Sequence, residues 1–501
     1  MHITYDKKHG VEYAKLCTSR RIGKTISKEY VNLGRVLDKE KGIYQNRERG
    51  LFTYQLSNNT YGTPEACFVP NRVAHSCKEK LILDFGDAFF LDRFISQIEM
   101  RTAINAVGYG NPDSLYAMVF FYILCSAANC HANDWWEGSY VRILFTKANL
   151  TSQRISNLLA AIGDESSLRG FFREYLSHVT GDRKSMENGN ILIDSTGLPN
   201  GIHFPLTAIS NHNGEISNEV RLIYVVQQET GLPIYFRYCP GNVIDTTTLI
   251  RTISELKASG VNTKFAILDA GYYDDENIRA LYREKVSFIT RLKENRKIYK
   301  QLVETWLPTI ECKENLVNYN NRYAYIKCVE CELIEGYRAY AYIGLDIDRK
   351  ASESKKLFQK AKAKSLTNEE VYDRMTRQGV FVLVSSRPVA KEKILPTYYT
   401  RQQIEQVFDI GKNYADLLPL RVQNEDTFRG HLLLTFIATV IIKKLQDKLK
   451  NSSYNPISLF ANLRNQKCKV YENTIITQEA FKKANDCYKL FNIECPVEIG
   501  R

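Results

Sequence analysis

The chain has 501 residues, too many for one hydrophobic core, so its length predicts several domains. Hydrophobic residues make up 44% of the chain, which suits a folded protein and excludes an intrinsically disordered one. The formal net charge of +12 is compatible with nucleic acid or another polyanion as a partner, although many enzymes are mildly basic.

Twelve cysteines are spread along the chain without the spacing of a disulfide framework. The C-x-x-C pair Cys328 and Cys331 has no second pair nearby, so we expect two half-buried, reduced thiols on a strand rather than a zinc site. The N-terminus lacks an apolar signal core, and the longest apolar runs, such as 432–442, are too short to span a bilayer. We therefore expect a cytoplasmic protein that does not associate with membranes.

The N-terminal third divides into two regions by its pattern. Residues 1–85 contain short strand-like segments separated by turns, which predict a small mixed or β region. Residues 86–185 have helical apolar patterns and form a candidate DNA-binding domain. In the predicted helix 151–163, Gln153 and Arg154 occupy the first turn and could enter a DNA groove. An ordinary packed helix with a solvated first turn explains the same pattern equally well.

Residues 186–298 alternate predicted strands and helices, which indicates an α/β layer with strands buried on both faces. Two strongly apolar strands there end in an acid, ILID in Asp194 and FAILD in Asp269. A carboxylate in that position needs a partner, a metal ion or solvent. Two such acids at neighbouring strand ends can converge on one site. Taken singly, each aspartate is better explained as a turn residue, since Asp is common in turns.

The remaining part of the chain divides into three segments. Residues 299–378 break the α/β rhythm with Tyr-rich strands and a charged helical stretch, and we interpret them as a β-rich and helical insertion. The core resumes over 379–450 with a buried strand and a polar-edged helix. A helical tail is expected over 451–501.

Four polar residues share one edge of the helix that begins near residue 398. At 100° per residue they fall within a stripe about 60° wide. The edge is either a solvated face with a weak i,i+4 ion pair, or a phosphate-handling face on which the acid holds a metal ion. The four residues are Tyr398, Arg401, Glu405 and Lys412.

Those residues form the pattern Y-x2-R-x3-E-x6-K, which resembles the signature of the IS4-type DDE transposases. The block DST at 194–196 and the block DAGYYDDENI from Asp269 resemble the segments that carry the two aspartates of that family. PGNVIDTTTL and FITRLKENRK are similar to its intervening segments. The N-terminal YVNLGRVLDKEKG and the later NEDTFRGH block resemble the IS1634-like branch.

The resemblance implies an RNase H-like catalytic core in which Asp194, Asp269 and Glu405 bind two Mg²⁺ or Mn²⁺ ions. It implies an insertion-sequence transposase that binds terminal inverted repeats on double-stranded DNA. Such an enzyme cleaves the DNA strand at the transposon end and joins the freed end to target DNA. A homodimer assembled on paired ends is the family expectation.

The resemblance also implies DNA-backbone contacts around the acids. Tyr398, Arg401 and Lys412 would hold phosphates near the cleaved end, and such contacts position DNA without reading its sequence. Arg291 and Lys293 are further candidates, although a solvated basic face is the better explanation for either of them taken singly.

One departure from the family concerns the residue after the motif arginine. Some relatives carry a tryptophan there, which handles a flipped base at a hairpinned end, whereas this chain has Gln402. A hairpin intermediate is therefore not supported by the sequence, although another aromatic side chain could substitute.

Two alternative functions use the same residues. One is an RNase H-like nuclease that cuts DNA without integration, and the other is a DNA-binding protein with an inactive core. The absence of G-x-x-x-x-G-K-[ST], H-E-x-x-H and G-x-S-x-G motifs argues against a P-loop or hydrolase enzyme.

Overall fold

The computed structural model describes residues 1–8, 11–22, 25–46, 48–64, 81–179, 189–200, 204, 206–212, 215–243, 247–363, 367–420 and 422–500. The chain forms two compact units. Unit 1 comprises residues 1–82, 469–477 and 496–501, and unit 2 comprises residues 83–468 and 478–495. The expected domain boundary at 185–186 lies outside the described residues.

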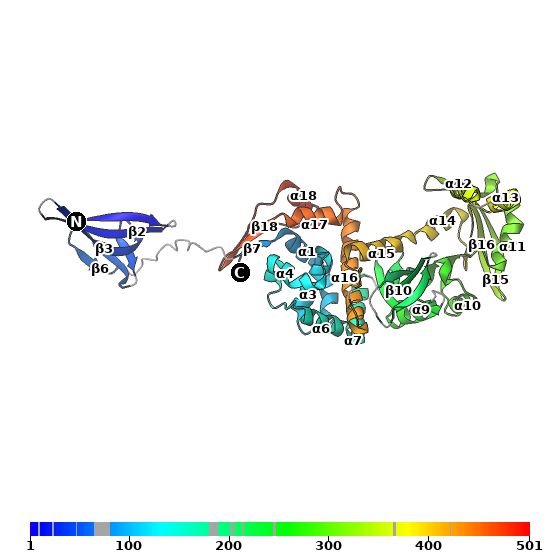
Figure 1. Cartoon of the computed structure of the whole chain (residues 1–501), viewed down its shortest axis with the longest axis horizontal. Helices are drawn as coiled ribbons and strands as arrows, with labels where there is room; N and C mark the ends of the chain where they lie inside the picture. Colours follow the sequence, from blue (N-terminus) through cyan, green and yellow to red (C-terminus); the bar gives the residue numbers. More distant parts are fainter. Residues whose placement is uncertain are drawn as a thin grey trace. The chain divides into compact units, whose positions relative to one another are not determined.

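Unit 1 is built around an antiparallel sheet of six strands in sequential order, drawn in blue in Figure 1. Its core residues are Ala14, Leu16, Leu33, Tyr44, Phe52 and Tyr54. A bulge in the third strand places Gly34 at φ +91, where a Cβ would meet the Gln45 carbonyl oxygen at 2.2 Å. The strands are β1 (His2–Lys8), β2 (Val11–Ile22), β3 (Thr25–Asp38), β4 (Ile43–Asn46), β5 (Gly50–Gln55) and β6 (Thr60–Gly62).

The division between the two units at residues 82–83 falls within a short strand, β7 (Leu81–Asp84), and the first part of unit 2 after it is helical. The longest apolar helix there, α3, begins where the Asn111 side chain accepts the Ser114 amide and Pro112 occupies the first turn. The helices are α1 (Gly86–Gln97), α2 (Met100–Asn105), α3 (Pro112–Leu124), α4 (Ala132–Gly138), α5 (Val141–Leu144), α6 (Ser152–Ile162) and α7 (Glu165–Val179).

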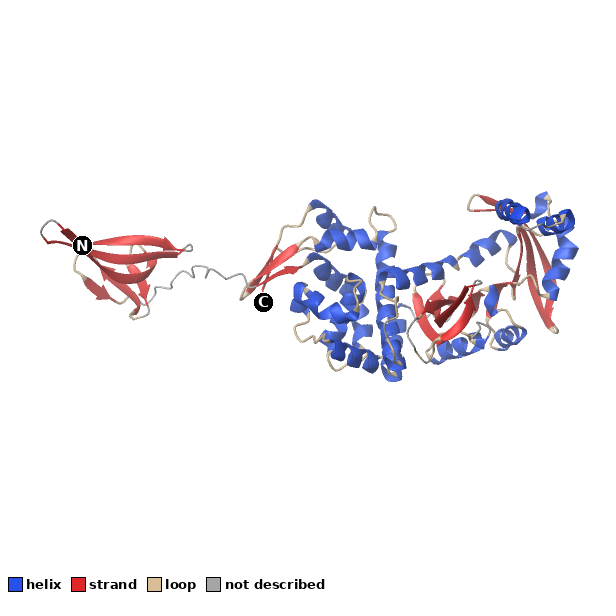
Figure 2. Ribbon diagram, in the orientation of Figure 1, coloured by secondary structure: helices blue, strands red, loops and turns tan. Residues whose placement is uncertain are grey.

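Unit 2 also contains a ten-stranded mixed sheet, and Figure 2 draws its strands, like all others in the chain, in red. Its order is β11-β10-β8-β12-β13-β17-β16-β15-β14, and β9 pairs with β10. The pairs β8–β12 and β12–β13 are parallel, and the other described pairs are antiparallel. The first strands are β8 (Asn190–Pro199), β9 (Ala208–His212), β10 (Glu215–Gln227), β11 (Pro233–Pro240), β12 (Phe265–Leu268) and β13 (Ser287–Arg291).

The segment expected to be an insertion extends this same sheet, because β16 pairs with the core strand β17. Helices α9 and α10 separate the parallel strands in the chain, and α11 to α13 accompany the insertion. The remaining elements of this part are β14 (Leu316–Tyr319), β15 (Arg322–Ile334), β16 (Tyr337–Asp346), β17 (Val380–Ser385), α9 (Leu249–Ala258), α10 (Asp275–Arg283), α11 (Lys297–Trp306), α12 (Ile347–Ala363) and α13 (Asn368–Thr376).

A long buried helix, α16 (Glu425–Leu449), joins the helical part of unit 2 to the sheet part. It packs against α3 and α6 and also against α15 and β11. Figure 1 shows it in orange, with the cyan helices on one side and the green sheet region on the other. Within the described part of the chain, no single helix is long and apolar enough to cross a membrane. One bent pair, Pro112–Leu124 with Asn129–Gly138, meets the length and composition criteria together.

The end of the chain differs from the expected helical tail. It contains α17 (Pro456–Arg464) and α18 (Lys482–Leu490), but also β18 (Lys467–Val470), β19 (Thr474–Thr477) and β20 (Glu498–Gly500). The sequences KCKV and TIIT bury every second side chain, which is the period of a strand and not of a helix.

Candidate active site

Asp194 and Asp269 lie side by side where two parallel strands end their pairing. The last paired residues of β8 and β12 are Ile193 and Leu268, which directly precede the two aspartates. Parallel strands in this register bring the residues that follow them to the same edge. The topology therefore brings together two acids that are far apart in the sequence.

The two aspartates nevertheless have different backbone settings. β12 ends at Leu268, and the Asp269 carboxylate accepts the Gly271 amide at 3.4 Å. β8 instead continues to Pro199, because it remains paired with the long strand β10. The prediction that Asp194 ends its strand is therefore wrong: Asp194 lies within it.

The helix that carries the other predicted residues is divided in two. α14 (Lys391–Tyr399) ends just before α15 (Gln402–Tyr414) begins. At the junction, the Arg401 and Ile404 amides each bond the carbonyl three residues back rather than four. Thr400 also donates its hydroxyl to the Thr397 carbonyl at 2.7 Å. The single continuous helix expected from the sequence is thus wrong, and Arg401 lies at its break.

Arg401 binds all three predicted acids with one guanidinium group. Its Nη1 donates to Asp269 Oδ1 at 2.9 Å and to Asp194 Oδ2 at 3.4 Å, and its Nη2 donates to Glu405 Oε1 at 3.4 Å. Burial alone would lower the pKa of Arg401, but Asp194 and then Asp269 outweigh burial and raise it. The arginine is therefore charged and neutralises part of the acid cluster.

A cavity of about 620 Å³ opens beside this cluster. It is lined by Asp269, Arg401 and Glu405 together with three of the predicted DNA-contact residues, Arg291, Lys293 and Tyr398. Burial raises the pKa of Tyr398 to about 12, so its hydroxyl stays protonated and can donate a hydrogen bond. The side chain of Glu405 is 59% exposed and that of Asp194 only 15%, so the acids differ in access to solvent.

Lys412 lies away from the cavity lining and is bonded to β8. Its Nζ donates to Thr196 Oγ1 at 2.7 Å and to the Gly197 carbonyl at 3.3 Å. Burial lowers its pKa. Lys412 therefore ties α15 to the strand that carries Asp194.

The other residues singled out from the sequence do not line this cavity. Gln153 and Arg154 lie exposed on the first turn of α6, where Gln153 donates to Asn157 at 3.0 Å. Cys328 and Cys331 lie on β15, with Cys328 exposed and Cys331 half-buried.

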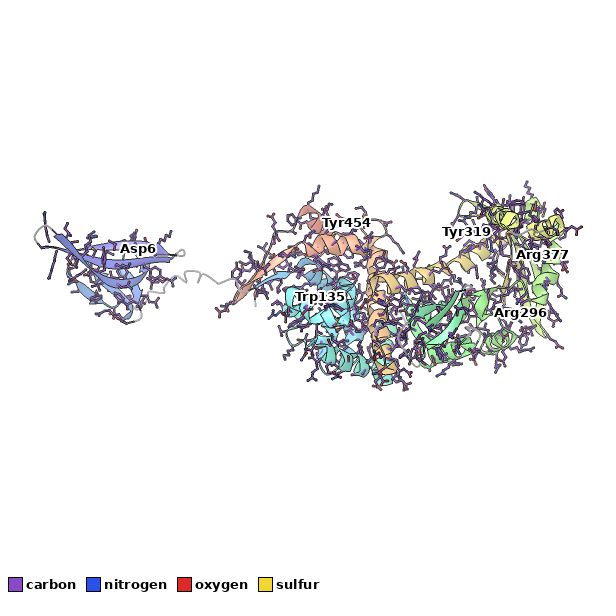
Figure 3. The ribbon with its side chains drawn as sticks, viewed as in Figure 1. Asp6, Trp135, Arg296, Tyr319, Arg377 and Tyr454 are labelled. Atoms are coloured by element: carbon purple, nitrogen blue, oxygen red, sulfur yellow. The ribbon has the colours of Figure 1, made fainter. Side chains whose placement is uncertain are left out.

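Sequence reasoning did not identify a second, smaller cavity of about 240 Å³ beside the first. Gln402 and Tyr399 line both cavities. The Tyr399 ring stacks on Tyr319 of β14, with ring centroids 5.5 Å apart and planes at 10°. Figure 3 labels Tyr319. The adjacent tyrosines at 398–399 are visible in the sequence. No pattern in the sequence predicts that Tyr399 contacts Tyr319, which lies about 80 positions earlier (399 − 319).

The donor set fits a hard divalent cation, because three carboxylates gather and Asp194 and Asp269 approach a single point, Arg401 Nη1. As the side chains stand, that point is taken by the arginine. Among the described residues, no three His, Cys, Asp or Glu side chains converge closely enough to hold a metal ion by themselves. Holding a metal ion would therefore require Arg401 to leave the carboxylates.

Residues 188–441 match the family described as the transposase DDE domain. The match spans just over half of the chain and includes all three acids. The chain therefore belongs to the transposase DDE domain family, which confirms the resemblance to DDE transposases.

A solved structure is also similar to this chain: the cryo-EM structure of the piggyBac transposase synaptic complex with hairpin DNA. The TM-score is 0.40 at 9% sequence identity, over 75% of this chain and 79% of that chain. No curated protein matched the chain.

Proposed function

We propose that the chain is the transposase of an insertion sequence, of the IS4-type and IS1634-like kind. It would bind terminal inverted repeats on double-stranded DNA, cleave the strand at the transposon end and transfer the freed end to target DNA. The observation that carries the proposal is the meeting of Asp194, Asp269 and Glu405 on one guanidinium. We further propose a cytoplasmic enzyme that acts as a homodimer on paired ends.

We propose an RNase H-like core for the sheet part of unit 2. Three strands pair antiparallel in the order β11-β10-β8, and β12 and β13 continue the sheet in parallel. This arrangement supports the proposal because it brings two acids to one edge, where ligands of α/β sheets bind. The strands β14 to β16 would be the insertion of that core.

The three acids would hold two Mg²⁺ or Mn²⁺ ions, which supply an activated attacking oxygen and neutralise the leaving 3′-oxygen. Arg401 would turn from the carboxylates to a DNA phosphate, with which a guanidinium forms two parallel hydrogen bonds. The phosphate would then balance the charge of Arg401 in place of the carboxylates, and Asp194 and Asp269 would be available to bind metal ions.

DNA would enter through the cavity beside the acids. Arg291, Lys293 and Tyr398 line it and would hold phosphates on either side of the scissile bond. Lys412 would contact phosphate only after releasing Thr196, so we assign it first to fixing β8. Gln153 and Arg154, exposed on α6, are our proposed contacts to the terminal repeat.

The test is cleavage of a duplex that carries the terminal repeat and its flank, with Mg²⁺, by the wild type and by Asp269→Ala. The matched control is Asp409→Ala, an exposed acid one turn after Glu405 that does not line the cavity. We expect the control to cleave normally and Asp269→Ala to be inactive. Equal cleavage by both variants would refute the site.

The same reaction separates the alternative functions. Pre-cut ends joined to a second duplex support the transposase, whereas nicks without joined products support a nuclease without integration activity. Binding with no cleavage by the wild type supports a catalytically inactive DNA-binding protein.

A further inference from the structure

The far half of the β2–β3 hairpin in unit 1 is exposed on both faces. Residues 19–21 of β2 and 26–32 of β3 are all exposed, although the pairing of the strands continues to their ends. The core of unit 1 lies nearer the other end of the hairpin, at Ala14, Leu16 and Leu33. Residues 30–32 still pair with Lys15, Leu16 and Cys17 at the edge of the core, and the hairpin between them and the turn extends beyond the hydrophobic core that supports the rest of the sheet.

One face of this arm combines cations with apolar groups. Arg21 pairs directly with Ile26, Ser19 with Lys28, and side chains two residues apart on a strand share a face. Tyr30 therefore lies on the same face as Ile26 and Lys28. Ile26 is 62% exposed and Tyr30 is 57% exposed. This surface, the arm face, consists of Ser19, Arg21, Ile26, Lys28 and Tyr30.

The charge of the arm face is not balanced by acids. Among the described residues, no ion pair forms with Arg21 or Lys28, whereas Lys15 nearer the core pairs with Asp6 at 3.2 Å. Residues 1–62 contain twelve Lys and Arg against six Asp and Glu, a net charge of +6. Half of the chain's net charge of +12 thus lies in about an eighth of its length.

We propose that the arm face binds duplex DNA, with the two-stranded ribbon entering the major groove. That groove is about 12 Å wide and admits a two-stranded β-ribbon. Arg21 and Lys28 contact phosphates, and the Tyr30 ring and Ile26 contact sugars or thymine methyl groups. The inference rests on the proposed function only in taking DNA as the polyanion, since binding by the arm needs no cleavage.

The same residues could instead serve only to keep the protein from aggregating, and that role predicts a different experimental result. Charged residues on exposed ribbons also prevent strands from pairing between molecules. In that case Arg21 and Lys28 would protect against aggregation and make no contribution to DNA affinity. The two roles are separable because only phosphate contacts change how binding depends on salt.

The experiment measures binding of the full-length protein to a 30-base-pair duplex of arbitrary sequence by fluorescence anisotropy, without metal and over a series of salt concentrations. The test variant is Arg21→Ala/Lys28→Ala. The matched control is Lys7→Ala/Lys41→Ala, which removes two exposed lysines from the opposite end of the same sheet. A third variant, Tyr30→Ala, removes the ring without changing the charge.

Log affinity falls as log salt rises, and each phosphate contact contributes about 0.9 to the steepness of that fall. We therefore expect the fall to be less steep by about 1.8 for the test variant than for the wild type. Tyr30→Ala should weaken binding about tenfold at an unchanged slope, and the control should bind as the wild type does. Equal slopes for test and control would overturn the proposal, as would aggregation of the test variant with unchanged affinity.

Metal-free binding also separates this inference from the proposed function. A protein that binds through the arm but never cleaves would leave the inference intact and refute the transposase. A protein that cleaves normally while the test and control variants bind alike would refute the arm and leave the transposase intact.

Discussion

The acid cluster and the arm face are both charged, but they are assembled in opposite ways. Asp194, Asp269 and Glu405 come from distant segments and share one counter-charge, and the two aspartates are partly buried while Glu405 is exposed. Arg21 and Lys28 lie on one hairpin and are exposed. Burial makes the charges of the cluster depend on each other, whereas solvent screens those of the arm. In the acid cluster, the effects of two mutations on stability should therefore be large and should depend on each other. In the arm face, they should be small and should add.

The largest expected effect is on catalysis. Replacing Asp194, Asp269 or Glu405 with alanine should lower the cleavage rate by about 10²–10³-fold or more, as the loss of a charge-stabilising group does in other active sites. Metal-free DNA affinity should be retained, because each change removes a negative charge. Single-turnover cleavage and anisotropy measure the two quantities, and a parallel loss of both would show that the acids maintain the fold rather than the chemistry.

The next effect is on stability and concerns Arg401. Arg401→Ala leaves three carboxylates without their shared partner, and breaking a buried ion pair costs about 3–5 kcal/mol. Because the cluster is partly solvated, we expect the free energy of unfolding to fall by about 2 kcal/mol. Millimolar Mg²⁺ should restore more stability to this variant than to the wild type, since it replaces the missing charge.

The control for that experiment is Arg349→Ala, which breaks an i,i+4 pair with Glu353 at 2.6 Å on α12. An i,i+4 helical pair contributes about 0.5 kcal/mol, and Glu353 keeps the hydrogen bond that it accepts from the Gly379 amide at 2.8 Å, so the loss should be small and indifferent to Mg²⁺. A similar Mg²⁺ response in both variants would mean that the three acids do not bind the ion as a group.

The grouping of the acids was predictable, and its details were not. Apolar runs before Asp194 and Asp269 and the helical period near Glu405 are local patterns, and they were enough to suggest one site. The continuation of β8 past Asp194 depends on pairing with β10, which no local pattern specifies. The same holds for the Tyr319–Tyr399 stack, because β14 reaches α14 only through tertiary packing.

The arm face shows a second limit of prediction from sequence, which concerns the burial of side chains. The sequence of residues 1–85 predicted a small mixed or β region, but it predicted neither the β2–β3 hairpin nor the point where the core ends along it. The same alternation of side chains buries Leu16 and exposes Arg20 four residues later on the same face. Only the position of the other strands distinguishes the supported half of the hairpin from the exposed half.

A smaller effect is expected at Lys412. Lys412→Met removes the 2.7 Å bond to Thr196 but also relieves the burial of a charge, so the net loss of stability should be about 1 kcal/mol. Burial lowers the pKa of Lys412 below its ordinary value of 10.5, so the unfolded chain binds more protons just below that pH. The stability of the wild type relative to the variant should therefore rise as the pH approaches 10.5. Denaturant titrations at pH 8 and pH 10 measure this, and a difference that falls with pH would contradict the assignment.

The smallest effect is expected on the arm. Arg21→Ala/Lys28→Ala removes two charges that no described acid pairs with, so the free energy of unfolding should change by less than about 0.5 kcal/mol. The same two substitutions should nevertheless weaken DNA binding, which no stabilising role of these side chains would produce. Unfolding and binding measured on one preparation decide the point. A stability loss as large as that of Arg401→Ala would show that the arm packs against something, and the contrast between a coupled cluster and an independent surface would fail.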